Sequence, residues 1–412
     1  MDNPFVSQWI AISLCGISLL AYSCSNSDNA TSSFSLRLEK LRAVRFDIPL
    51  APKPYNSGTF RDEQGKTIFY FAQTKTKKYV ALCDSNGRQL QLTPLDEAVE
   101  TLQEVNGVAV LNKDTFVAMS YSTDSKCNVD RTGHVSHIVV YGDKHAGHRA
   151  LIDPTNVELL EDRNSILAFI AYILDSPNIP EAEFKKMFAD EIKSAPIVRI
   201  NNLRSDSPSF TYFLKGIQTR YQPYPAVPDN FAIATFATDG KHIFYNSGYR
   251  DSLYKYDLIS NQIVAAKKLV SPSIQLGIRR PKNIYDSAPL SEAFPIGAVC
   301  PAMTYDPYRG YLYMPFYHEV AADVPPNEQW EHRAWSLLVY DTSLHKLAEI
   351  PFGKEQFIPK TIFCSPEGIW IRIYSEDPRD TRYQLFKFVC DDQATVHTDS
   401  SASDGGLPHT IQ

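Results

Sequence analysis

The chain has 412 residues and a formal net charge of −6, from 41 Lys and Arg against 47 Asp and Glu. This mild acidity argues against a nucleic-acid-binding protein, which needs a concentrated basic face to displace the counterions of phosphates. Hydrophobic residues make up 43% of the sequence and aromatic residues 12%, which is enough for a sizeable core and excludes a largely disordered chain. Aromatic side chains at this density favour pleated sheets, so the composition predicts a β-rich globular protein.

Residues 1–24 have the features of a signal peptide. The run 9–22 is apolar and uncharged, and its 14 residues are fewer than the roughly 20 that span a bilayer. Ala21, Tyr22 and Ser23 precede Cys24, and a polar stretch follows at 25–33. This resembles a bacterial lipoprotein signal, although residues 1–8 lack a cation and Tyr22 is large for its position. We expect lipidation of Cys24 and a polar tether over 25–33; the alternatives are a signal that is only cleaved, or one retained as an anchor.

Five further cysteines follow Cys24, and an odd number cannot pair completely within the chain. No C-x-x-C spacing suggests a zinc site or a redox pair. We expect each to be a small apolar residue buried in a strand. They are Cys83, Cys127, Cys300, Cys364 and Cys390.

Short runs of alternating apolar residues recur along the chain, and each leads into a polar turn. They lie at 79–87, 137–147, 196–206, 252–262, 336–346 and 383–392. Aligned on the residue that opens the turn, or on Phe388 at the end of the last run, their spacings are 58, 59, 56, 84 and 47 residues. Similar runs flank most of them, so each unit reads as a meander of three or four strands. Such sheets bury both faces when they are arranged radially.

The pattern predicts an all-β fold, a six-bladed β-propeller over residues 34–390. A strand within 34–50 would complete the last blade, and residues 391–412 form a polar tail that we expect to be disordered. The periodicity of 180–192 predicts a short amphipathic helix inserted in the third blade. Two stacked sandwich domains are the alternative fold, although no Pro-, Gly- or Ser-rich linker divides the chain.

Four stretches resemble a family of known fold. Residues 188–203, 220–258, 303–319 and 335–352 are similar to TolB-like six-bladed propeller lipoproteins from Bacteroidota, whose biochemical function is undefined. The resemblance covers roughly residues 40–390 and rests on strand and turn signatures. It implies a lipid-anchored envelope protein and supplies no catalytic residues. Met314 and Pro315 stand where the family usually has an aromatic residue and an Arg.

The densest group of metal-ligating residues lies at 133–148. It holds four of the ten histidines, namely His134, His137, His145 and His148. Alternation along a strand would place the first two on opposite faces, so they are weak candidates for a metal site, and surface histidines are the default interpretation. His318 and Glu319 begin an H-E-x-x-H pattern, but its fifth position is Ala322. The sequence therefore implies no metal and no cofactor.

Arginines and aromatic residues gather in two segments between strands, 219–231 and 325–335, and a basic triplet lies at 279–282. Arginine and aromatic residues dominate recognition surfaces, so these segments could bind a ligand. Alternatively, the aromatic rings pack between blades and the cations are simply solvated. The candidate ligand-binding residues are Arg220, Tyr221, Tyr224, Arg279, Arg280, Trp330 and Arg333.

These features favour a non-catalytic binding or assembly module, held in the cell envelope by a lipid anchor, for a protein, glycan or small ligand. The alternatives are a propeller-type hydrolase or lyase with its site at the channel mouth, and a sensor subunit of an envelope transport or signalling system. In the lipoprotein group that the chain resembles, an acidic run just after the Cys is the signal for export to the cell surface. Residues 25–29 contain only Asp28 as an acidic residue, so the resemblance favours the periplasmic face of the outer membrane.

Overall fold

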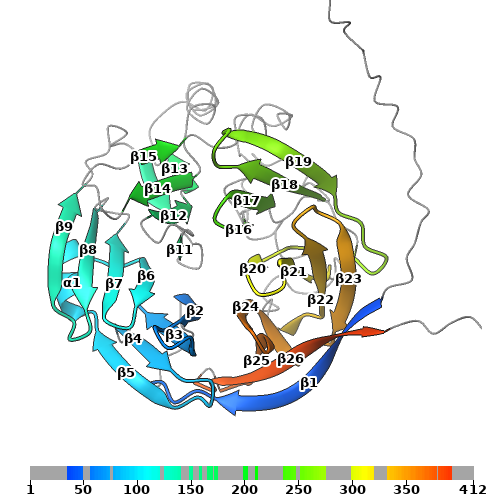
Figure 1. Ribbon diagram of the computed structural model, residues 1–412, viewed down its shortest axis with the longest axis horizontal. Coiled ribbons are helices and arrows are strands. Elements are labelled where there is room, and N and C mark those ends of the chain that lie inside the picture. Colours follow the sequence, from blue (N-terminus) through cyan, green and yellow to red (C-terminus); the bar gives the residue numbers. More distant parts are fainter. Residues whose placement is uncertain are drawn as a thin grey trace, which may run out of the picture. The chain divides into compact units, whose positions relative to one another are not determined.

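The computed structural model describes residues 35–49, 56–74, 78–120, 125–140, 235–246, 251–274, 298–319, 332–377 and 379–391. Between residues 148 and 211 it describes the backbone of six strands. The residues Ser35–Asp392 form one compact unit. Its sheets stand around a central axis (Figure 1). No helix among the described residues is both long enough and apolar enough to cross a membrane.

Five four-stranded sheets each come from one continuous stretch of chain. The first contains β2 (Asn56–Arg61), β3 (Thr67–Gln73), β4 (Tyr79–Cys83) and β5 (Gln89–Pro94). The second contains β6 (Gly107–Asn112), β7 (Thr115–Ser120), β8 (Ser125–Asp130) and β9 (Val135–Val140). The third contains β11 (Val157–Leu159), β12 (Ser165–Phe169), β14 (Val198–Asn202) and β15 (Ser209–Thr211).

The remaining strands complete the ring. The fourth sheet contains β16 (Thr235–Thr238), β17 (His242–Asn246), β18 (Ser252–Asp257) and β19 (Gln262–Lys268), and the fifth contains β20 (Thr304–Asp306), β21 (Tyr311–Tyr317), β22 (Trp335–Asp341) and β23 (Lys346–Phe352). The closing sheet joins β24 (Phe357–Ser365), β25 (Gly368–Ile373) and β26 (Arg382–Asp391) to β1 (Ser35–Arg45). Strands β10 (His148–Leu151) and β13 (Ala171–Leu174) form a separate two-stranded sheet.

The predicted fold class is wrong in two respects. Five blades, not six, each come from one continuous stretch, because the last repeat supplies only three strands and its sheet is completed by β1 from the other end of the chain. The one helix that the described residues contain is α1 (Asp96–Leu102), between the first and second sheets, where no helix was predicted. The predicted helix at 180–192 lies outside the described residues.

Hairpin turns with one repeated pattern explain why the chain reverses where it does. In each, the side-chain Oδ1 of an Asp accepts hydrogen bonds from the backbone N–H groups two and four residues later, as Asp62 does from Gln64 and Lys66. Asp84 and Asp130 open their turns in the same way. The residue three positions after each of these Asp is a Gly with φ between 75° and 92°, a conformation that an L side chain rarely adopts.

The N-terminal strand closes the ring, as predicted. Strand β1 pairs antiparallel with β26 from Ser35↔Asp391 to Arg45↔Arg382, with a register shift between Lys40 and Ala43. The chain then continues between the closing sheet and the first blade, where Phe46 is 1% exposed. The ring of Phe46 lies 4.9 to 6.1 Å from four other aromatic rings, which belong to Phe69, Phe71, Trp370 and Tyr383. This aromatic cluster joins the first blade to the last.

Replacing Phe46 with Ala should weaken this junction. We expect Phe46→Ala to lower the free energy of unfolding by about 3–5 kcal/mol, the cost of emptying a large aromatic site in a packed core. Ile259→Ala is the control, because Ile259 is 88% exposed and its truncation should change stability by about 0.5 kcal/mol or less. Urea unfolding of the three proteins measures the difference, and an equal effect of both substitutions would contradict the role given to Phe46.

Candidate functional site

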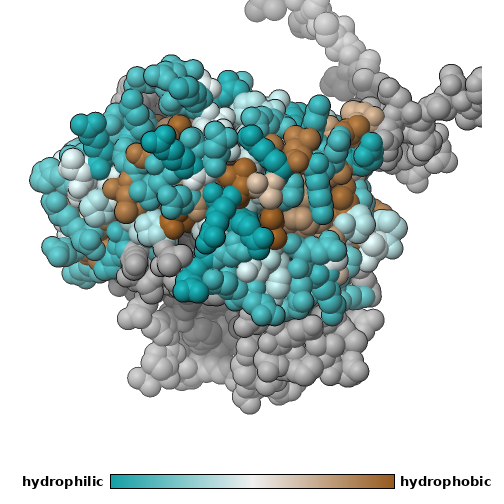
Figure 2. Space-filling model, turned by 90° about the horizontal axis from the view of Figure 1, so that it is seen from below, coloured by the Kyte–Doolittle hydropathy of each residue, from teal (hydrophilic) through white to brown (hydrophobic). Residues whose placement is uncertain are grey.

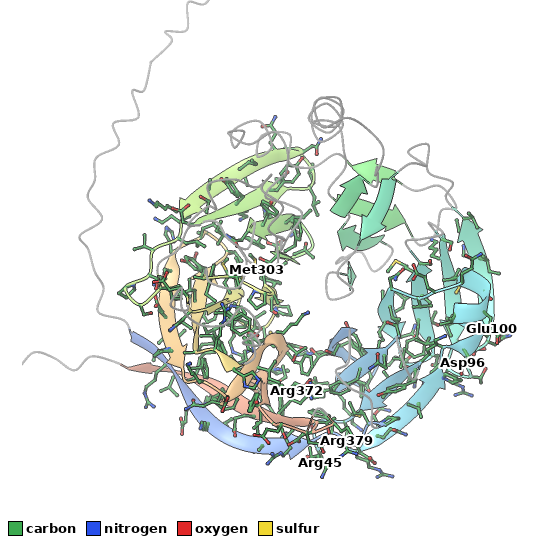
Figure 3. All side chains as sticks on the ribbon, turned by 180° about the vertical axis from the view of Figure 1, so that it is seen from behind. Arg45, Asp96, Glu100, Met303, Arg372 and Arg379 are labelled. Atoms are coloured by element: carbon green, nitrogen blue, oxygen red, sulfur yellow. The ribbon has the colours of Figure 1, made fainter. Side chains whose placement is uncertain are left out.

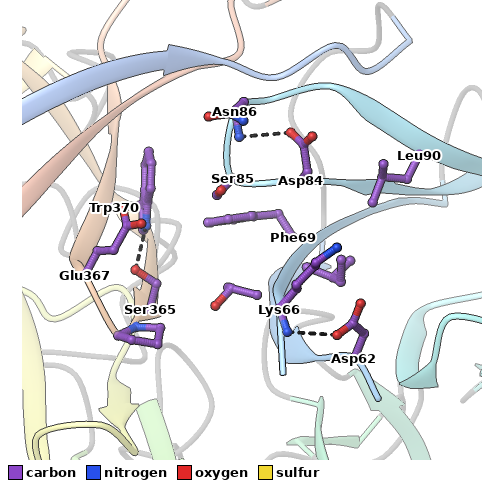
Figure 4. Close-up of a pocket in the computed structure, with 13 residues that line it drawn as sticks. Asp62, Lys66, Phe69, Asp84, Ser85, Asn86, Leu90, Ser365, Glu367 and Trp370 are labelled. Atoms are coloured by element: carbon purple, nitrogen blue, oxygen red, sulfur yellow. Dashed lines mark hydrogen bonds between the residues drawn. The ribbon is translucent and has the colours of Figure 1, made fainter. Parts of the chain in front are cut away.

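A pocket of about 490 Å³ lies at the junction of the first blade and the closing sheet. Three hairpin turns build it: β2–β3, β4–β5 and β24–β25 (Figure 4). Its lining residues are Asp62, Lys66, Thr67, Ile68, Phe69, Asp84, Ser85, Asn86, Leu90, Ser365, Pro366, Glu367 and Trp370. Residues from opposite ends of the sequence therefore meet in one concave site.

The pocket has a polar rim and a closed apolar floor. Phe69 and Trp370 are both 0% exposed, so neither ring offers a face on which a ligand can stack. Lys66, Asn86 and Glu367 are exposed at the rim, and Asp62 and Asp84 are half-buried beside them. A ligand in this pocket would therefore be held mainly by hydrogen bonds and charge rather than by aromatic contact.

The rim carboxylates are oriented by the turns that contain them. Asp62 and Asp84 each use Oδ1 to accept two backbone hydrogen bonds of 2.8 to 3.0 Å, which fixes the plane of the carboxylate. The second oxygen, Oδ2, lies outside these turn bonds. Because the geometry is set before any ligand arrives, binding at this rim costs little ordering of side chains.

The third wall of the pocket is held by β1 and by the fifth blade. Arg42 of β1 donates to Glu367 Oε2 at 3.0 Å, and its guanidinium lies 5.7 Å from the centre of the Trp370 ring. The indole N–H of Trp370 donates to Ser365 Oγ at 3.0 Å. From the fifth blade, Arg309 donates to the backbone carbonyl oxygens of Ser365 and Pro366 at 3.1 Å. The β24–β25 turn is thus fixed from both sides.

Behind this wall lies a buried ion pair. Asp306 is 0% exposed and accepts hydrogen bonds of 2.6 Å from the guanidinium of Arg309 and from the hydroxyl of Tyr313. Burial works against the charged guanidinium, but the hydrogen bond and the charge of Asp306 outweigh it and raise the pKa of Arg309. Burial, with the charge of nearby acidic groups, raises the pKa of Tyr313 far above its ordinary value. The phenol therefore stays protonated and donates.

Most residues that the sequence singled out lie outside the described residues. These are Cys24, His145, Arg220, Tyr221, Tyr224, Arg279, Arg280 and Trp330, and of His148 only the backbone, in β10, is described. Arg333 is described and is 2% exposed. Two residues later, Trp335 stacks on Phe352 at 4.1 Å, and its indole N–H donates to the backbone oxygen of Phe357 in β24 at 3.0 Å, so this end of the 325–335 segment packs between the fifth blade and the closing sheet.

His134 and His137 lie at the surface, the default that the sequence favoured. The Nδ1 atom of His134 is 3.3 Å from Glu97 Oε1, and His137 occupies a bulged position with φ of 50°. Among the described residues, no three His, Cys, Asp or Glu side chains are placed together to hold a metal ion. Four of the five described cysteines are buried as predicted, whereas Cys390 is exposed on β26.

The sequence did not predict the contacts of two further histidines, His318 and His332. His332 Nδ1 lies 2.9 Å from Glu355 Oε1 and 3.2 Å from the Tyr374 hydroxyl, which joins the fifth blade to the closing sheet. His318, which began the incomplete metal motif, has Nε2 2.8 Å from the buried hydroxyl of Ser336. Burial lowers the pKa of His318 and favours its neutral form.

The pocket residues were also not predicted from the sequence. The repeated Asp-x-x-Gly pattern at 62–65 and 84–87, which marks two of the turns that line the pocket, is the signal that could have found them.

The chain that leads toward Arg279 and Arg280 is fixed to the outer strand of the fifth blade. Glu349 on β23 accepts hydrogen bonds from the hydroxyls of Ser271 and Ser273 and, at 2.5 Å, from Lys346 Nζ. Its side chain is 10% exposed. Burial works to raise the pKa of this carboxyl, but the hydrogen bonds from Lys346 and the two serines outweigh it and hold the pKa below its ordinary value of 4.5.

This cluster predicts a pH-dependent contribution to stability. The pKa of Glu349 is lower in the folded protein than in the unfolded chain. Its ionised carboxylate therefore contributes fully to the free energy of unfolding above pH 4.5, and this contribution is lost as the pH falls through the pKa of the folded protein. We expect Glu349→Gln to lower the free energy of unfolding by about 1–3 kcal/mol at pH 7. This difference from the wild type should disappear at acid pH, where the wild-type carboxyl is protonated. Urea unfolding between pH 7 and pH 3 measures it, with Glu100→Gln on the exposed face of α1 as control. A gap that does not change with pH would contradict this role.

No family model and no curated protein matches the sequence. Among solved structures, a member of the DUF4221 family from Bacteroides vulgatus aligns with 86% of this chain and 99% of its own, at 14% identity and a TM-score of 0.68. A luciferin-regenerating enzyme aligns with 86% of this chain and 95% of its own, at 12% identity and a TM-score of 0.43. The calcium-binding protein regucalcin from Agrobacterium tumefaciens aligns with 82% and 92%, at 11% identity and a TM-score of 0.41.

The last two similarities are too low to bear on this chain. The similarity to the Bacteroides protein, at 14% identity, shows a shared fold and leaves function open. The chain is therefore a β-propeller of the kind found in that Bacteroides protein.

Proposed function

We propose that this protein is a non-catalytic binding propeller whose ligand site is the pocket between the first blade and the closing sheet. The observation that carries the proposal is the convergence of three hairpin turns, from the two ends of the chain, on one rim of polar groups. Two rim carboxylates are already oriented by turn hydrogen bonds, and Glu367 is paired with Arg42. Carboxylates committed in this way serve better as hydrogen-bond acceptors for a ligand than as acids or bases.

The chemistry of the rim favours a short glycan or another polyhydroxylated small molecule. Asp62 and Asp84 offer carboxylate oxygens as acceptors, Lys66 offers an ammonium donor, and Asn86 offers both kinds of group. A volume of about 490 Å³ is within the range of small-molecule sites. The closed floor removes the stacking surface that a planar aromatic ligand would need.

The envelope location belongs to the same proposal. The signal-like residues 1–24, the similarity of the fold to a Bacteroides protein and the resemblance to TolB-like lipoprotein propellers support a Bacteroidota lipoprotein tethered through Cys24. We place it at the outer membrane, facing the periplasm, because residues 25–29 contain one acidic residue, Asp28, in place of the acidic run that marks surface export in the resembled lipoproteins.

The pocket is tested with a panel of monosaccharides, disaccharides, amino sugars and linear polyols. A ligand at a hundred times its Kd stabilises a protein by about 2.7 kcal/mol, so we expect at least one member to raise the Tm by a few degrees. Lys66→Ala combined with Asn86→Ala should weaken binding of that ligand about tenfold by calorimetry, because two hydrogen bonds are lost. Lys113→Ala combined with Ser343→Ala, in exposed turns of other blades, is the control. A panel without any shift, or equal losses in both double variants, would contradict the proposal.

The tether is tested by Cys24→Ser, with Cys15→Ser as the control in the same signal segment. We expect Cys24→Ser to abolish labelling by radioactive palmitate and to release the protein from membranes washed at high salt, which screens electrostatic attachment. Cys15→Ser should keep both properties. Palmitate labelling of Cys24→Ser at the wild-type level would rule out the tether.

A further inference from the structure

The closing sheet is basic in a chain that is acidic as a whole. With its turns, it contains nine Lys and Arg against six Asp and Glu, a net charge of +3 that comes from β1, whereas the whole chain carries −6. Strand β1 alone holds four cations, Arg37, Lys40, Arg42 and Arg45, against the single acid Glu39. The opposite charge lies elsewhere on the ring, as on α1, which has three acidic residues and no basic one.

The cations of β1 reach the surface. Strand β1 is the outermost of the closing sheet, so its free edge faces outward, and all four cationic residues are exposed. The side of the molecule seen in Figure 2 is mostly hydrophilic, with apolar residues in scattered patches. Figure 3 shows Arg45, Arg372 and Arg379 near one another at the closing sheet, and Asp96 and Glu100 farther along the rim. The charge is therefore polarised around the ring.

Part of this charge is neutralised within the protein. Arg42 pairs with Glu367, Arg379 pairs with Asp377, and Arg382 pairs with Asp380. Arg45 stands directly opposite Arg382 across the β1–β26 ladder, where Asp380 offsets the charge of Arg382 and the charge of Arg45 acts on Asp377. The exposed side chains of the β1 cations can still meet an external anion.

If Cys24 carries the proposed lipid, the position of β1 in the chain favours phospholipid headgroups as this anion. Strand β1 begins at Ser35, and only residues 25–34 separate it from Cys24. Ten residues of extended chain reach at most about 35 Å, so a lipid at Cys24 would hold the closing sheet close to the bilayer. Residues 25–34 contain no Lys or Arg, so the cations nearest to the lipid are those of β1.

We propose that the exposed basic edge of β1, carried by Arg37, Lys40 and Arg45, docks on anionic phospholipid headgroups. This inference rests on the proposed tether for its orientation. Each cation near an anionic bilayer surface strengthens binding by roughly fivefold, so three of them form a useful second contact beside one lipid anchor. Docking turns the closing sheet, and not the acidic α1, toward the membrane.

The test uses the full chain with Cys24→Ser, so that no acyl chain contributes to binding. The probes are vesicles of phosphatidylcholine with and without phosphatidylglycerol, and co-sedimentation measures the bound fraction. We expect binding to the phosphatidylglycerol vesicles only, weakening as salt is raised. Adding Arg37→Gln, Lys40→Gln and Arg45→Gln should reduce it about tenfold or more. The matched control removes three exposed lysines from other blades: Lys113→Gln, Lys241→Gln and Lys267→Gln.

The outcomes separate this proposal from its alternatives. Equal losses in the two triple variants would mean that overall charge governs binding, and no binding to anionic vesicles at low salt would overturn the proposal outright. Cations on an edge strand also guard against pairing between copies. Dimers or aggregates of the β1 variant on size-exclusion chromatography, with lipid binding unchanged, would assign them that role instead. Palmitate labelling of Cys24 is scored separately, so failure of the tether and failure of docking give different results.

Discussion

The antiparallel pairing of β1 with β26 is the constraint on which the rest of the structure depends. A propeller buries its sheets only when each blade has a neighbour on both sides, and the first and last blades become neighbours only when the ring closes. Strand β1 performs this closure, and the chain that follows it places Phe46 among rings from both blades. A break at this junction would expose the aromatic cluster and separate the turns that build the pocket.

The polar groups at the junction follow from the same constraint. Arg309 reaches from the fifth blade to the backbone of the β24–β25 turn, and its charge is offset by the buried carboxylate of Asp306. Arg42 reaches from β1 to Glu367 in the same turn. Burying a charge is costly unless it is paired and hydrogen-bonded, so the Asp306–Arg309 pair fixes the β24–β25 turn against the fifth blade. The exposed pair of Arg42 and Glu367 holds the same turn against β1, and together these interactions position one wall of the pocket.

The proposed activities use one region of the ring for two tasks. The pocket presents acceptors and donors in a fixed arrangement, and the basic edge of β1 lies on the closing sheet that forms one of its walls. Arg42 belongs to both regions, since it is a β1 cation that holds a rim carboxylate. A ligand site beside a membrane-facing edge would suit a protein that meets its ligand in the cell envelope.

Local sequence patterns were enough to predict the strand-rich propeller class, strands such as β18 and β22, and the closing strand near the N-terminus. These are local, because period-two alternation and turn residues are read from a few neighbours. Helix α1 was not predicted, because it has only seven residues and no side-chain cap, and because its burial depends on contacts with the second blade. The blade boundaries and the pocket depend instead on contacts between distant parts of the chain, which local patterns do not show. Asp62 and Glu367 come from opposite ends of the chain, and ring closure alone brings their turns together.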